Sequence, residues 1–115
     1  MTTNGELLLK KLQLLEEHGG FIVFAIDEYY IQFYKDDDTG ELDFEAVSHN
    51  FLDTLSTDLA ADFERLGFKI SEENYSKKIY PEKFAEVVED AAFIFSNIYL
   101  VDYTKPFEVT DEISY

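Results

Sequence analysis

Residues 21–34 read FIVFAIDEYYIQFY, and this stretch decides the fold. Its first part, from Phe21 to Ile26, is a short apolar run rich in aromatic and β-branched residues, which predicts a strand buried on both faces. Asp27 and Glu28 interrupt the run and predict a turn. Residues 29–34 continue as a second strand, so the stretch predicts an antiparallel hairpin with a short connection.

The flanking residues extend this hairpin in both directions. After it, the loop composition of residues 36–40 and the alternation of residues 42–48 predict a third strand that completes an antiparallel meander. Before it, Thr3 and Glu6 have the spacing of a capping box. A stripe of leucines follows and ends at a glycine pair, which predicts a helix over residues 4–18.

The second half of the chain predicts two more helices and two short strands. Apolar spacing indicates a helix that begins at Ser56 and ends at Gly67. Residues 68–70 and 75–80 indicate short strands, and residues 81–99 form the most strongly periodic helical segment of the chain.

These elements predict a single two-layer α+β domain over residues 1–101. Its antiparallel sheet and helices follow the order α-β-β-β-α-β-β-α. Residues 102–115 contain a proline and scattered acids without a period, and they are interpreted as a loose C-terminal tail.

Composition limits the classes of function. The chain has 115 residues and a mass of 13.4 kDa, which is the size of one domain. Its net charge of −16 opposes nucleic-acid phosphates and anionic membrane surfaces, so neither is expected as a partner. Cysteine is absent, which excludes disulfides and thiolate nucleophiles. The first residues lack a secretory signal and no apolar run is long enough to span a membrane, so we expect a soluble cytoplasmic protein.

No group of residues in the sequence predicts catalysis, a metal site or a cofactor. Residues 36–41 are acidic, but no register of this run places oxygen ligands and a glycine where a calcium loop needs them. His18 suits the dipole at the end of the first helix, and His49 suits a hydrogen bond that anchors a loop. We therefore expect a protein that is not an enzyme.

The aromatic residues point to a binding surface on the sheet. The chain contains 8 tyrosines and 11 phenylalanines. If Ile31 and Phe33 face the core, then Tyr30 and Tyr34 lie on the opposite sheet face. The third strand adds to that face Asp43, Glu45 and Val47. The first strand adds one of its two alternating sets, either Phe21, Val23 and Ala25 or Ile22, Phe24 and Ile26.

The candidate protein-binding surface consists of four residues from the first three strands: Phe24, Tyr30, Tyr34 and Val47. An exposed aromatic and apolar patch with an acidic rim is typical of an interaction site. The alternative is that the third helix or the C-terminal tail covers this face.

Two stretches resemble a known family. Residues 30–52 read YIQFYKDDDTGELDFEAVSHNFL and residues 63–68 read FERLGF. Together they resemble the TY-Chap group of peptide-binding, chaperone-like domains, which is grouped with type III secretion chaperones and YbjN. The likeness covers residues 6–99, and it implies a type III secretion chaperone-like α+β fold.

The resemblance implies a bacterial, non-enzymatic module that holds an extended segment of a partner protein, and it implies a small acidic homodimer. Two other functions stay open. One is an acidic immunity or inhibitor protein that binds a basic partner by charge complementarity, for which a net charge of −16 is sufficient to steer association. The other is a YbjN-like stress or sensory regulator.

Overall fold

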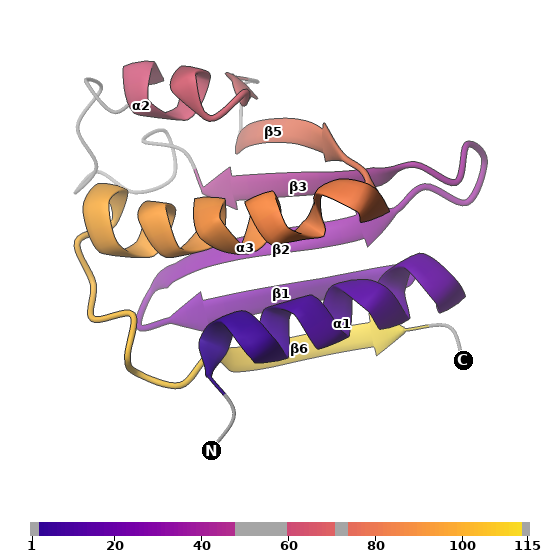
Figure 1. Ribbon diagram of the computed structural model, residues 1–115, viewed down its shortest axis with the longest axis horizontal. Coiled ribbons are helices and arrows are strands. Elements are labelled where there is room, and N and C mark those ends of the chain that lie inside the picture. The colour runs from indigo at the N-terminus through magenta and orange to yellow at the C-terminus, as the bar shows by residue number, and fades with distance from the viewer. Residues whose placement is uncertain (1–2, 48–59, 71–73, 114–115) are drawn as a thin grey trace.

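The computed structural model describes residues 3–47, 60–70 and 74–113. Its six strands form one antiparallel sheet in the order β4-β5-β3-β2-β1-β6 (Figure 1). The strands are β1 (Gly20–Ile26), β2 (Tyr29–Lys35), β3 (Leu42–Val47), β4 (Lys69–Ile70), β5 (Asn74–Ile79) and β6 (Glu108–Ile113).

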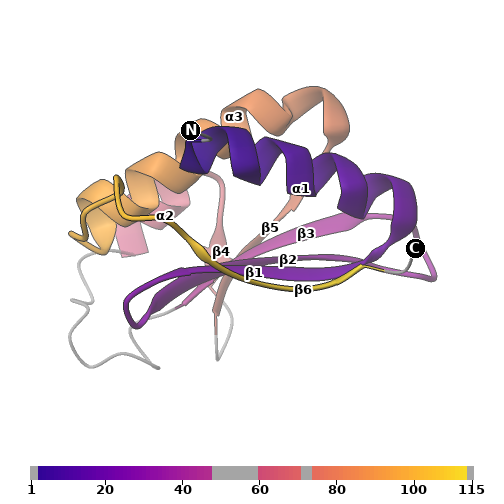
Figure 2. The ribbon, with the colours of Figure 1, turned by 90° about the horizontal axis from the view of Figure 1, so that it is seen from below.

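The helices lie on one face of this sheet. They are α1 (Asn4–His18), α2 (Ala60–Arg65) and α3 (Phe84–Phe93). Figure 2 shows α1 and α3 side by side above the strands. On the same face, Phe63 of α2 stacks on Tyr75 of β5 with ring centroids 4.1 Å apart. The predicted α+β class with helices on an antiparallel sheet is therefore confirmed.

The first helix has the predicted bounds, and it begins and ends at the predicted capping residues, Thr3 and Gly19. The Thr3 hydroxyl accepts a hydrogen bond from the backbone N–H of Glu6 at 3.1 Å. Three leucines of the stripe are fully buried against the sheet: Leu8, Leu12 and Leu15. Gly19 follows with a φ of 81°, a conformation that glycine adopts without steric cost.

The predicted third helix is also present, although its turns differ in type. A short 3-10 turn (Pro81–Lys83) leads into α3, and a π-helical segment (Ile94–Ile98) continues it. The helix ends at Leu100, which has a φ of 59° and is 78% exposed. The N–H of Val101 then donates to the carbonyl of Phe95 at 2.9 Å, which closes the helix end.

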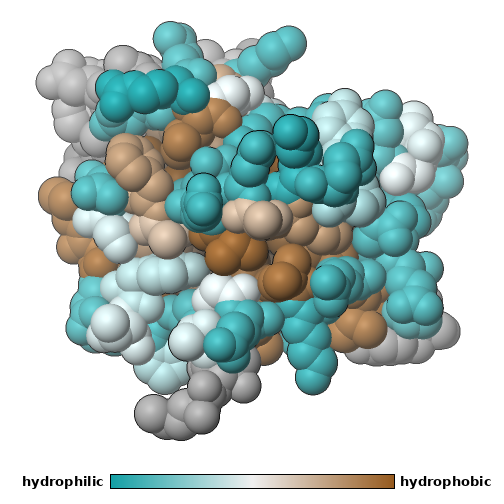
Figure 3. Space-filling model, in the orientation of Figure 1, coloured by the Kyte–Doolittle hydropathy of each residue, from teal (hydrophilic) through white to brown (hydrophobic). Residues whose placement is uncertain are grey.

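The hydrophobic core fills the space between the sheet and the helices. Aromatic rings from neighbouring strands meet there: the centroids of Phe24 and Phe33 lie 5.8 Å apart, and those of Phe33 and Phe44 lie 4.4 Å apart. From the helix side, apolar side chains show in a band between α1 and α3 (Figure 3). The two helices approach closely at Gly5, where an added Cβ would lie 3.1 Å from a methyl carbon of Val88.

One prediction about the first strand is wrong. β1 is buried on one face only, because Ile22, Phe24 and Ile26 point to the helices. Phe21, on the other face, is 37% exposed. The physical reason is that all helices of the described chain lie on the same side of the sheet.

The interpretation of residues 102–115 as a loose tail is also wrong for the described part. Residues 108–113 form β6, which pairs with β1 along its length. Phe107 precedes the strand and is 8% exposed in the core. The backbone of Gly20 fits this pairing closely, since a Cβ there would lie 2.0 Å from the carbonyl oxygen of Glu112. The sequence of β6 has no alternating apolar pattern that would predict a strand, because only Val109 and Ile113 are apolar. The strand is stabilised instead by pairing with β1, which is distant in sequence.

The second half of the fold follows the prediction where it is described. Phe63 of α2 is fully buried, and Gly67 follows the helix with a φ of 92°. The predicted helix start at Ser56 and the histidine at position 49 lie outside the described residues. None of the described helices combines the length and the apolar character that crossing a membrane requires.

Candidate functional site

The sheet face opposite the helices carries the candidate site, and we call it the open face. No described helix covers it (Figure 2). Because neighbouring residues of a strand point to opposite faces, the buried residues of β1 and β2 identify the set on the open face. The outward residues of β1 and β2 are Phe21, Val23, Ala25, Tyr30, Gln32 and Tyr34.

The strand register aligns one row of side chains across the open face. Tyr34 of β2 lies between Phe21 of β1 and Asp43 of β3. The row continues beyond Asp43 to Lys78 and beyond Phe21 to Glu112. Phe21 and Tyr34 are each 37% exposed. Two aromatic rings therefore stand next to each other at the centre of the row, with charged residues at both ends.

A buried carboxylate supports the centre of this row. Asp43 is 7% exposed, and its Oδ1 lies 2.8 Å from the ammonium nitrogen of Lys78. The hydroxyl of Tyr34 donates a hydrogen bond to Asp43. Burial, together with the nearby negative charge of Asp43, raises the pKa of Tyr34. Tyr34 therefore keeps its hydroxyl proton at neutral pH.

Lys78 donates hydrogen bonds to the carboxylates of Asp43 and Glu41. They raise the pKa of Lys78 above its ordinary value, so the lysine keeps its positive charge. Its ammonium nitrogen lies 3.2 Å from Glu41 Oε2, which adds a second carboxylate to the pair with Asp43. The open face thus has a fixed cation at its β5 side.

A second row runs parallel to the first one. Gln32 of β2 lies opposite Glu45 of β3, and its Nε2 donates to Glu45 Oε2 at 2.6 Å. On the other side of Gln32 the row continues through Val23 to Thr110. These two neighbouring rows therefore combine two exposed rings, an aliphatic side chain and a polar pair joined by a hydrogen bond.

Two of the four residues predicted for the surface lie on the open face. Tyr34 is exposed there, and Tyr30 is half-buried there, with its backbone oxygen accepting a hydrogen bond from the hydroxyl of Tyr99 at 2.8 Å. Val47 ends β3 opposite Asn74, and its side chain lies outside the described residues.

The assignment of Phe24 to the surface is wrong. Phe24 is fully buried on the helix side, where its ring packs on Phe107 with centroids 5.1 Å apart. Phe21 takes its place on the open face. The signal for this was in the sequence: a two-residue turn places Ile26 opposite Tyr29, and this register puts Phe21 opposite Tyr34.

Charge is distributed unevenly across the open face. The β6 side presents Glu108 and Glu112, both exposed. The β4 and β5 side presents Lys69 and Lys78. Five of the nine cationic residues of the chain fall between positions 65 and 83: Arg65, Lys69, Lys77, Lys78 and Lys83. The acidic surplus is therefore concentrated away from the β4 and β5 edge.

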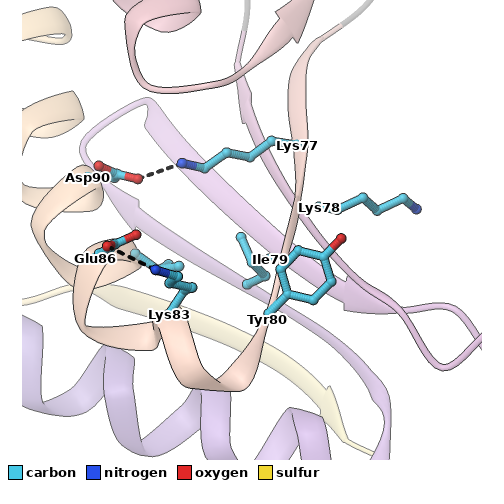
Figure 4. A pocket seen from close by; sticks show the side chains of 8 residues that line it. Lys77, Lys78, Ile79, Tyr80, Lys83, Glu86 and Asp90 are labelled. Carbon is cyan, nitrogen blue, oxygen red and sulfur yellow. Dashed lines mark hydrogen bonds and ion pairs between the residues drawn. The ribbon is translucent and has the colours of Figure 1, made fainter.

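A small pocket of about 120 Å³ lies between β5 and α3, and its lysines have structural partners (Figure 4). Lys77 points toward α3, where its ammonium nitrogen lies 2.6 Å from Asp90 Oδ2, and Lys78 points the other way. Lys77 also donates to the carbonyl of Leu66 at 2.7 Å and lies 4.9 Å from the ring centre of Phe68. These contacts explain Lys77 as a group that joins β5 to α3.

A larger pocket of about 590 Å³ lies where the start of α1 meets the segment before β6. Leu7, Tyr103 and Phe107 are among its lining residues. The Tyr103 hydroxyl is buried with no hydrogen-bond partner in the described chain, and burial raises the pKa of Tyr103 to about 12. The lining is mainly apolar, and it gives no arrangement of groups suited to catalysis.

The acidic hairpin loop forms a turn. Asp36 Oδ1 accepts from the backbone N–H of Asp38 at 2.8 Å and from that of Thr39 at 3.3 Å, as aspartates do in tight turns. Gly40 closes the loop with a φ of 74°. Within residues 3–47, 60–70 and 74–113, no three histidine or carboxylate side chains come together as a metal site would require.

Comparisons with known proteins identify no relative of this chain. The resemblance of residues 30–52 and 63–68 to the TY-Chap group stays a prediction. The chain matches no protein-family model, no curated protein and no solved structure.

Proposed function

We propose that the protein is a non-enzymatic, chaperone-like binding module that holds an extended segment of a partner protein against the open face. The observation that carries this proposal is the adjacent pair of Phe21 and Tyr34, each 37% exposed on a sheet face that no described helix covers. Exposed aromatic pairs with a charged rim favour protein recognition.

The chemistry of the open face defines the segment that it would hold. Apolar side chains of the segment would cover the rings of Phe21 and Tyr34 and the aliphatic Val23. Basic side chains would lie toward β6, where Glu108 and Glu112 are exposed. On the opposite side, Lys78 is paired with Asp43 and Glu41, so that side offers less free negative charge to basic residues than β6 does.

A second candidate is an acidic inhibitor of a basic partner, which the net charge of −16 favours. The two functions differ in their dependence on salt. An inhibitor that acts by charge should associate much more slowly at physiological than at low ionic strength. A segment held mainly by apolar contacts should lose little affinity over the same range.

Capture of partners from a lysate, followed by affinity measurement on the identified partner, tests the proposal. The variants Phe21→Ser and Tyr34→Ser should each weaken binding by about tenfold or more, since central aromatic residues dominate such interfaces. Tyr80→Ser is the matched control, because Tyr80 is 52% exposed but lines the pocket beside α3. Equal binding by all three variants, with unchanged circular dichroism, would exclude the open face as the site.

The oligomeric state tests the secretion-chaperone mode. Light scattering behind a sizing column, at low and at physiological salt, should give about twice the chain mass of 13.4 kDa if the protein acts as a small acidic dimer. A monomer at both salt concentrations would contradict that mode and favour the acidic inhibitor or a YbjN-like regulator.

A further inference from the structure

The side chain of Asn4 joins the start of α1 to the segment that leads into β6, and we call this contact the latch. Its Nδ2 donates to the backbone carbonyls of Tyr103 and Lys105, both at 2.8 Å. Its Oδ1 accepts from the backbone N–H of Phe107 at 3.2 Å. One side-chain amide therefore fixes a segment about a hundred residues away in sequence.

The latch requires an amide and not a carboxylate. Two of its three hydrogen bonds run from the amide NH₂ group to carbonyl oxygens. Aspartate at the same position has no donor when ionised, and its charge would stand against the carbonyls of Tyr103 and Lys105. The bond from Phe107 alone would remain.

Asn4 is followed by Gly5, and each of the two residues has its own structural role. Asn4 forms the latch, whereas Gly5 permits the close approach of α1 to α3 at Val88. Together they form an Asn-Gly pair, in which no side chain hinders attack of the glycine nitrogen on the asparagine side chain. As the second residue of α1, Gly5 also has an N–H without an acceptor inside the helix.

We propose that Asn4 is a deamidation site, and that its modification opens the latch and loosens β6 from β1. The backbone nitrogen of Gly5 attacks the Asn4 Cγ carbon and loses its proton, while the side-chain nitrogen leaves as ammonia. Water then opens the resulting succinimide to aspartate or isoaspartate. In the closed latch the amide is held toward residues 103–107, so the reaction proceeds from molecules in which this contact has opened.

The first experiment follows the reaction in the unmodified chain. The protein is kept at mildly alkaline pH, either folded or in urea, and peptide mass spectrometry measures the gain of about one dalton at Asn4. We expect the folded protein to react at about one tenth of the rate in urea or more slowly still, because only molecules with an open latch react. Equal rates in the two states would overturn the proposed protection by the latch.

The second experiment measures the consequence of the modification. In Asn4→Asp, protection of the β6 amides against hydrogen exchange should fall by roughly tenfold, while that of β2 and β3 stays unchanged. Asn97→Asp is the matched control, because Asn97 is exposed, its side chain forms no hydrogen bond to the described residues 103–107, and the substitution adds the same charge. Unchanged β6 protection in Asn4→Asp, with a native circular dichroism spectrum, would overturn the role of the latch.

Discussion

The two faces of the sheet are built from alternate residues of the same strands, yet they differ in what those residues do. In β1, Phe24 is fully buried against the helices, whereas Phe21, three residues earlier, is 37% exposed on the open face. Both are phenylalanines with equal intrinsic strand preference. The difference shows that helix placement, and not local composition, decides which apolar residues stabilise the fold and which remain available to a partner.

The largest expected effect separates the two faces directly. Phe24→Ala should lower the free energy of unfolding by about 3–5 kcal/mol, because it leaves a cavity in the core. Phe21→Ala should lower it by less than about 1 kcal/mol, because solvent already reaches its ring. Urea unfolding followed by circular dichroism measures both values. Similar losses for the two variants would remove the distinction between the faces.

The next prediction concerns the pairing that extends the sheet beyond β1. Gly20→Ala should cost about 3 kcal/mol, because its Cβ would lie 2.0 Å from the carbonyl oxygen of Glu112 and its φ is 109°. Gly40→Ala is the control, with a φ of 74° and no atom within 4 Å of the added carbon. It should cost only about 1–2 kcal/mol. Equal losses in urea unfolding would mean that β6 does not press on β1 at this point.

How far the sequence determines these features differs between the elements. The helix over residues 4–18 was predictable to its ends because its leucine stripe lies within it and its cap and terminal glycine directly flank it. β6 was not predictable in this way, since its partner is β1 and its own residues are mostly exposed, with half of them charged. A strand that depends on a distant edge carries no local signal.

The candidate site was predictable in part for a related reason. The alternation of β2 placed Tyr30 and Tyr34 on the face away from the core, which is confirmed. Periodicity could not choose between the two faces of β1, because every residue from Phe21 to Ile26 is apolar. The choice required the register across the turn at Asp27 and Glu28.

A smaller effect distinguishes tyrosines on the two sides of the molecule. The Tyr103 hydroxyl is buried without a partner in the described chain, so Tyr103→Phe should raise the free energy of unfolding by about 1 kcal/mol at neutral pH. Tyr34→Phe should instead destabilise slightly, because it removes the hydrogen bond to Asp43. Urea titrations of both variants test the two signs, and a loss of stability in Tyr103→Phe would contradict the burial argument.

The raised pKa of Tyr103 predicts that the free energy of unfolding depends on pH in the alkaline range. Burial raises the pKa of Tyr103 from 10.0 to about 12, so the folded protein retains a proton that the unfolded chain releases. Ionisation of Tyr103 therefore leaves the free energy of unfolding unchanged below pH 10 and lowers it as the pH rises from about 10 to 12. Unfolding free energies measured at pH 9 and pH 11 should fall less in Tyr103→Phe than in the unmodified protein. An equal decline would assign the loss to other groups.

The smallest effect tests whether exposed apolar residues outside the open face have a role in folding. Leu100→Gly should stabilise the protein by about 0.5 kcal/mol, because Leu100 has a φ of 59° and glycine adopts that conformation without strain. Thermal unfolding measures this change. The variant should leave partner binding unchanged; weaker binding would extend the recognition surface to the end of α3.

The pairing of β1 with β6 has a consequence for the order in which the molecule is made. A ribosome releases β1 early in synthesis and β6 last among the described strands, so the nascent sheet carries an unsatisfied edge during most of translation. Exposed strand edges recruit other chains. Molecules whose synthesis stops before residue 108 therefore lack β6, and the backbone groups of β1 that pair with it are left unsatisfied.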